Sequence, residues 1–180
     1  MRSCYKVAVT AFVLAAFAAP VAAQGLWIGA GASIPSGDYG DYADTGWIVN
    51  LGAGMPVGTS GLGVGVELTY GQNSHSDVDG DSTNPISIMG GLGYNLGGED
   101  SSISPYVFGM LGMMFHKYNS DEFEGSTDSG LGFGGGAGIN FPLGGLQGYL
   151  EGRYLTASID ESTTAYIGIT AGVNIALGGN

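Results

Sequence analysis

Residues 62–72, LGVGVELTYGQ, alternate between apolar side chains and small or polar ones at every step. Val66 and Leu68 fall on one face of this stretch. Glu67 and Thr69 fall on the other face, among glycines. A period of two is the period of a β-strand, so the stretch predicts a strand with one apolar face and one face of small or polar groups.

The same alternation recurs along the chain. In 131–143 and 164–177 it again opposes apolar residues to glycine, threonine and asparagine, whereas 104–118 is apolar on both faces and its facing cannot be assigned. Prolines mark strand ends, where a missing N–H costs least; they are Pro35, Pro56, Pro85, Pro105 and Pro142. The predicted strands are 25–35, 46–56, 62–73, 85–97, 104–118, 131–143, 147–157 and 164–177.

The polar face carries few charges. A soluble barrel would instead have an apolar cavity and a charged exterior, so the pattern argues against one. Small side chains suit the narrow interior of a barrel of eight strands. The apolar face then meets lipid, where closed barrels satisfy every backbone group of a sheet. The fold class is therefore predicted as all-β, an eight-stranded antiparallel up-and-down transmembrane β-barrel. Short connectors (57–61, 98–103, 144–146) alternate with mostly longer polar ones (36–45, 74–84, 119–130, 158–163), and the longer set is expected to face outward.

Aromatic residues concentrate near the ends of the predicted strands. Transmembrane barrels carry aromatic girdles at both membrane interfaces. The residues predicted to form them are Trp27, Trp47, Tyr70, Tyr94, Tyr106, Phe133, Phe141 and Tyr154.

The N-terminus has the organisation of an export signal. Arg2 and Lys6 precede an apolar run, 7–19, which is too short to span a bilayer as a helix. The run is followed by 20–24, PVAAQ, which offers small residues at the two positions that a signal peptidase reads. We expect a signal peptide at 1–23, cleaved after Ala23, and a barrel domain at 24–180. The remaining chain would have no cysteine, and two basic side chains would face sixteen acidic ones, which argues against nucleic acid as a partner.

Two stretches, 65–70 (GVELTY) and 149–155 (YLEGRYL), resemble barrel strands that carry a charge inward between lipid-facing apolar residues. On these stretches and the overall pattern, the chain resembles the small eight-stranded outer-membrane barrels of the outer membrane protein A and X types. The resemblance implies a bacterial outer-membrane location. One departure is that members commonly close the last strand with an aromatic residue, whereas residues 176–180 are ALGGN.

The inward charges predict a cluster inside the barrel. Glu67 lies on the third predicted strand, and Glu151 and Arg153 lie at similar height on the seventh, across a narrow lumen. Buried carboxylates need partners, so we expect a plug of these three residues, with Asn50 and Thr170 close in height. A gate that opens when the charges re-pair is the alternative.

The longer connectors are acidic. Residues 77–81, DVDGD, are similar to a calcium loop, but the glycine comes too early for an EF-hand and the closing glutamate is absent. Asp77, Asp79 and Asp81 are thus weak candidates for metal binding. The simpler interpretation is that the acidic loops are only solvated, and loose binding of divalent cations is the sharper alternative. Outer-membrane lipid is the expected partner, and a surface partner is not identified.

Catalysis has little support. Some small barrels modify lipids with a histidine, a serine and an acid, which makes His75 and His116 the candidates, but neither has a serine two residues away on the same strand face. The sequence predicts no enzyme activity and no cofactor. It favours a non-enzymatic outer-membrane barrel with acidic extracellular loops and a structural or surface-interaction role in the cell envelope. The alternatives are a narrow channel for small or hydrophobic solutes and a secreted fibre-forming protein.

Overall fold

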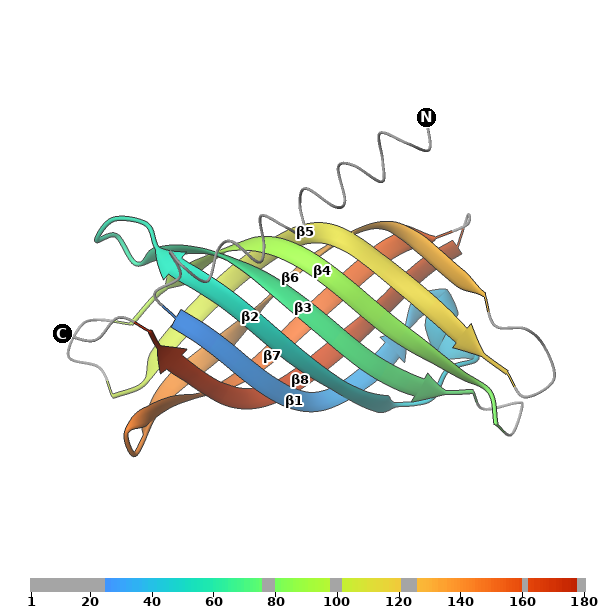
Figure 1. Ribbon diagram of the computed structural model, residues 1–180, viewed down its shortest axis with the longest axis horizontal. Coiled ribbons are helices and arrows are strands. Elements are labelled where there is room, and N and C mark those ends of the chain that lie inside the picture. Colours follow the sequence, from blue (N-terminus) through green and yellow to red (C-terminus); the bar gives the residue numbers. More distant parts are fainter. Residues whose placement is uncertain (1–24, 76–79, 98–101, 121–125, 160–161, 178–180) are drawn as a thin grey trace.

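The computed structural model describes residues 25–75, 80–97, 102–120, 126–159 and 162–177. These residues form eight strands and one short 3-10 helix. Figure 1 shows the strands wrapped around a common axis. The elements are β1 (Gly25–Ser36), η2 (Gly37–Asp41), β2 (Gly46–Pro56), β3 (Leu62–Ser74), β4 (Ser82–Asn95), β5 (Ser104–Asn119), β6 (Thr127–Leu143), β7 (Leu146–Ile159) and β8 (Ser162–Ala176).

The sheet is a closed barrel in which every strand pairs antiparallel with its sequence neighbours. β1 closes the barrel on β8, with Gly25 opposite Ala176 and Ser36 opposite Ala165. The predicted fold class is confirmed. No helix within the described ranges is long and apolar enough to cross a membrane.

The barrel has two distinct ends. We call the end that holds the start of β1 and the β2–β3, β4–β5 and β6–β7 connections the turn end, and the opposite end the loop end (Figure 1). The β6–β7 connection has only two residues between paired strands, and its Gly144 has a φ of +62°, which glycine adopts at little cost. In barrels of this kind the short turns face the periplasm.

The predicted strand faces are confirmed for β3, β6 and β8. On β3, Leu68 is exposed on the outer face and Glu67 and Thr69 are buried in the lumen. On β8, Ile169 is exposed and Thr170 is buried. The outer face is an apolar surface, as a lipid environment requires.

The facing of β5 is explained by the glycines of β6. Tyr106, Phe108 and Met114 point inward, and the inward positions paired beside them on β6 are glycines. A Cβ at Gly132 would lie 2.6 Å from the sulfur of Met114, and one at Gly138 would lie 2.6 Å from Cζ of Tyr106. The large side chains of β5 therefore occupy space that the glycines leave free.

Several strands extend further towards the loop end than predicted, β4 and β6 by the most residues. β4 begins at Ser82 rather than 85, and β6 begins at Thr127 rather than 131. β7 ends at Ile159 and β8 begins at Ser162, so the connector expected at 158–163 is only residues 160–161. The residues at these strand ends are mostly polar. The strands were predicted from apolar residues at alternate positions, so their polar ends were not recognised.

The expectation that Pro85 marks a strand end was wrong. Pro85 lies inside β4, paired with His116 of β5, while the β3–β4 ladder skips Pro85 and Asn84. The Asn84 side-chain amide donates instead to the Gly71 carbonyl, at 3.2 Å, and to the Tyr70 hydroxyl, at 2.8 Å. A side chain thus replaces the link between strands that the proline cannot make.

Candidate functional site

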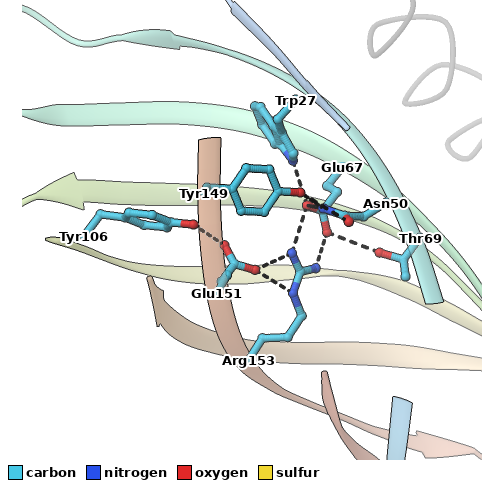
Figure 2. Close-up of polar contacts among 8 residues, drawn as sticks. All are labelled: Trp27, Asn50, Glu67, Thr69, Tyr106, Tyr149, Glu151 and Arg153. Carbon is cyan, nitrogen blue, oxygen red and sulfur yellow. Dashed lines mark hydrogen bonds and ion pairs between the residues drawn. The ribbon is translucent and has the colours of Figure 1, made fainter. Parts of the chain in front are cut away.

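A buried ion-pair network crosses the middle of the lumen. Arg153 of β7 lies between Glu67 of β3 and Glu151 of β7 (Figure 2). All three residues are at most 8% exposed. The guanidinium binds both carboxylate oxygens of Glu67, with Nη2 3.1 Å from Oε2. Nε and Nη2 also donate to Oε1 of Glu151, at 2.8 and 2.5 Å. Each strand places its charge inward because the residues on either side point outward.

Neutral donors complete the coordination of Glu67. Trp27 Nε1 donates to Oε2 at 2.8 Å, Asn50 Nδ2 donates to the same oxygen at 3.1 Å, and Thr69 Oγ1 donates to Oε1 at 3.2 Å. Asn50 also donates to the hydroxyl of Tyr149, at 3.0 Å. A buried carboxylate is tolerated when its lone pairs are filled in this way.

Glu151 has fewer partners than Glu67. One of its oxygens accepts both contacts from Arg153, and the other accepts a hydrogen bond of 2.8 Å from the Tyr106 hydroxyl. When both carboxyl groups are ionised, the network carries one more negative than positive charge. The arrangement can hold the strands of opposite walls together across the lumen, and its excess charge favours a cation over an anion.

The structure brings together Glu67, Glu151, Arg153 and Asn50. Thr170, the fifth residue of the predicted cluster, is buried and pairs with Glu151 in the β7–β8 register. Its hydroxyl makes no hydrogen bond with the described part of the chain. Thr170 is therefore a neighbour of the network rather than a member.

Trp27 and Tyr106 are not interface aromatics, so their predicted role was wrong. Both point into the lumen and donate to the network. The indole of Trp27 lies over Gly52 and Gly65, which have no side chains to displace it. The alternation of β1 was the missed signal, because exposed Ile28 places its neighbour Trp27 inward. Tyr149 was also missed, although it shares its strand face with Glu151.

The other aromatic candidates face outward. Phe141 is half-buried and covers Gly148 of the neighbouring strand. The rings of Trp47 and Tyr70 pack against each other near the loop end, with centroids 5.7 Å apart. The exposed members are Trp47, Tyr70, Tyr94, Phe133 and Tyr154.

An apolar layer fills the lumen on the loop side of the network. Ile48 precedes Asn50 by two residues on β2, and Leu155 follows Arg153 by two residues on β7, so both lie nearer the loop end. They are no more than 1% exposed. Met89, Met114 and Tyr166 belong to the same buried cluster.

A tyrosine cap closes the loop end above this layer. η2 holds Tyr39 in the lumen, 1% exposed, where its hydroxyl donates to Oδ1 of Asn73 at 3.2 Å. The ring of Tyr39 packs against His116, and the hydroxyls of Tyr42 and Tyr118 are 3.3 Å apart. Burial raises the pKa of both Tyr39 and Tyr42 above the usual tyrosine value. The hydroxyls of Tyr39 and Tyr42 therefore stay neutral at physiological pH, and the stability that their burial contributes is lost only as the pH rises past about 10.

The two histidines pack against the tyrosines of this cap. His75 is 2.8 Å from the Thr83 hydroxyl and packs edge-on against Tyr42. His116 is fully buried, and neither ring nitrogen has a partner in the described ranges. Within the described ranges of the chain, no hydrogen bond joins a histidine side chain to a serine side chain.

The described residues hold no group of three histidine, cysteine or acidic side chains arranged for a metal ion. Asp77 and Asp79, two of the weak candidates for metal binding, lie outside the described residues. Asp81 is described, and its carbonyl accepts a hydrogen bond of 3.0 Å from the backbone of His75. Asp38 and Asp41 are exposed on η2.

A closed barrel of eight strands, with an apolar exterior and a charged network in its lumen, defines a small outer-membrane β-barrel. The chain belongs to the family described as the outer membrane protein beta-barrel domain, whose profile matches residues 8–178. Membership places the protein in the bacterial outer membrane. A search among curated proteins gave no match.

Solved structures share the fold at low sequence identity. Neisserial surface protein A superimposes with a TM-score of 0.62 at 14% identity, covering 84% of this chain and 97% of that one. Ail, the attachment invasion locus protein of Yersinia pestis, gives 0.51 at 14% identity, covering 85% and 99%. The N-terminal barrel of Pseudomonas aeruginosa OprF gives 0.51 at 18% identity, covering 85% and 98%.

Proposed function

We propose that this protein is a non-enzymatic, non-conducting outer-membrane barrel that presents acidic loops at the cell surface, with a role in envelope integrity or surface interaction. The observation that carries the proposal is that the lumen is filled from the ion-pair network to the loop end. The network of Glu67, Glu151 and Arg153, the apolar layer around Leu155 and the cap around Tyr39 succeed one another along the axis. A channel for solutes would need a passage through all three.

Conductance tests the proposal directly. The barrel is refolded in detergent, shown to be folded by its heat-modifiable gel migration, and inserted into a planar lipid bilayer. We expect a folded barrel that gives no stable openings, because three layers obstruct the lumen. Stable openings of the wild-type protein would contradict the proposal and establish the channel alternative.

The acidic residues set the kind of partner that the loop end can attract. Sixteen acidic residues stand against four basic ones in the whole sequence, and Asp38 and Asp41 are exposed on η2. The structure of Ail in complex with a heparin analogue shows that one barrel of this fold binds a polyanion. For this chain we propose the opposite preference, a cationic surface, since an acidic loop end repels polyanions.

Charge substitutions at η2 test this preference. Nanodisc-embedded barrel is passed over immobilised polylysine, and we expect Asp38→Asn with Asp41→Asn to weaken binding roughly two- to thirtyfold, from about 0.2–1 kcal/mol per exposed charge. The matched control, Asp38→Glu with Asp41→Glu, keeps the charge and should retain binding. Equal binding of wild type and the asparagine variant, or stronger binding to polyglutamate, would contradict the preference.

Export completes the proposal. A cleaved signal at 1–23, with Arg2 and Lys6 before the apolar run, would deliver the chain across the inner membrane. The lipid of the outer membrane is then the partner of the apolar exterior.

A further inference from the structure

The lumen on the turn side of the network is an open chamber. Its volume is about 590 Å³, within the range of about 300–1,000 Å³ typical of small-molecule sites. Glycines such as Gly63 and Gly93 form one wall, and Phe108 and Met110 of β5 form another. The chamber opens towards the turn end, and therefore towards the periplasm, and its floor is the ion-pair network.

The excess charge of the network lies on the floor of this chamber. Glu67 accepts from Arg153, Trp27, Asn50 and Thr69, so its oxygens are well supplied with donors. Glu151 lines the chamber, and its Oε2 accepts only the Tyr106 hydroxyl among the described residues. A carboxylate oxygen has room for a second donor. An incoming ammonium group would fill that position and neutralise the network.

The walls suit the rest of such a molecule. The aromatic side chains of Trp27, Tyr106, Phe108 and Tyr149 line the same chamber as Glu151. Ring faces attract cations, and the rings together with Met110 also provide apolar contact. An anionic ligand would meet the excess carboxylate, and a neutral apolar ligand would leave the second position of Oε2 empty.

We propose that this chamber is a binding site, entered from the periplasm, for small organic ammonium compounds with an apolar body. The ammonium group binds Oε2 of Glu151 beside the Tyr106 hydroxyl, and the apolar part lies between the aromatic side chains and the glycine wall. The inference goes beyond the proposed surface role and does not depend on it, because the site and the loops lie at opposite ends of the barrel.

The two tryptophans of the chain make the test direct. Trp27 lines the chamber and Trp47 is exposed on the outer face, so Trp47→Phe leaves Trp27 as the one tryptophan of the sequence, which can be excited selectively. Hexylammonium, hexanol and hexanoate are titrated into this variant in a nonionic detergent. We expect a saturable change in Trp27 fluorescence with hexylammonium, a weaker one with hexanol and none with hexanoate.

Three further variants in the Trp47→Phe background assign the response to the site. Glu151→Gln removes the excess charge but leaves Glu67 paired with Arg153, so the barrel should fold and bind hexylammonium at least about tenfold more weakly. Gly93→Leu should block the chamber, since a Cβ there meets nothing closer than 3.8 Å and the side chain extends into the open space. Gly152→Leu, the same change on the outer face, should leave binding intact.

Several results would overturn the proposal. Equal responses to all three probes would assign the signal to micelle partitioning. An unchanged affinity in folded Glu151→Gln would remove the carboxylate from the site. A response to sodium chloride as large as that to hexylammonium chloride would assign the floor to an inorganic cation. No response from a folded Trp47→Phe barrel would mean that the chamber does not bind the probe.

Discussion

Arg153→Met is expected to destabilise the barrel by about 3–5 kcal/mol, because it leaves Glu67 and Glu151 buried without their cation. The measurement is the urea midpoint of barrel refolded into lipid vesicles, followed by heat-modifiable migration. Lys117→Met is the matched control. It removes the other basic residue of the strands from an exposed position, and we expect little change.

The same variant separates a structural plug from a gate. We expect Arg153→Met to remain at background conductance, since the apolar layer and the tyrosine cap still obstruct the lumen. Replacing all three charges, with Glu67→Gln, Glu151→Gln and Arg153→Met together, should recover most of the lost stability, because no uncompensated charge remains. Stable openings in the single variant, with unchanged stability, would support the gate instead.

Gly136→Leu is the second substitution with a large expected effect. A Cβ at Gly136 would lie 2.7 Å from Cζ of Phe108 and 2.9 Å from Cα of Arg153. The added side chain has no free space and must push β6 away from β7. We expect a loss of about 1–3 kcal/mol or more and a smaller folded fraction on heat-modifiable gels.

The control for this prediction is the same substitution at Gly152, which lies next to the Gly136–Arg153 pair but on the outer face of the barrel. Gly152 pairs with Ala137, adjacent to the Gly136–Arg153 pair, and nothing lies within 4 Å of a Cβ placed there. Gly152→Leu adds apolar surface towards lipid and should be neutral or stabilising. Similar losses for both variants would mean that leucine in these strands, rather than the packed lumen, causes the effect.

The barrel could be predicted from the sequence because alternation repeats in most strands, 104–118 excepted, and assigns the inner and outer faces of a strand together. In 65–70, for example, Glu67 can point inward only if Val66 and Leu68 point outward. The charged cluster could be predicted from the same alternation, because Glu151 and Arg153 share the inner face of one strand and Glu67 lies across the lumen from them. The alternation of β1 also places Trp27 inward, but the residue was predicted at the interface because it is aromatic and lies near a strand end.

Other features could not be obtained from the pattern because they depend on contacts between distant segments. The facing of β5 follows from the glycines of β6, which β5 meets only after pairing. Pro85 is accommodated inside β4 by the side chain of Asn84 bonded to the neighbouring strand. The tyrosine cap depends on η2 turning into the lumen, which places Tyr39 beside His116, far along the chain.

The pairing of β1 with β8 has a consequence for how the barrel forms. Gly25 and Ala176 are opposite each other, so the last ladder joins segments separated by nearly the whole chain. Contacts of such long sequence separation form slowly, because the loop that they close is long. Until β8 arrives, the partly assembled sheet has two unpaired edges that can pair with other chains. The protein therefore depends on protection from aggregation during its passage to the membrane, and a chain that lost β8 would expose such an edge permanently.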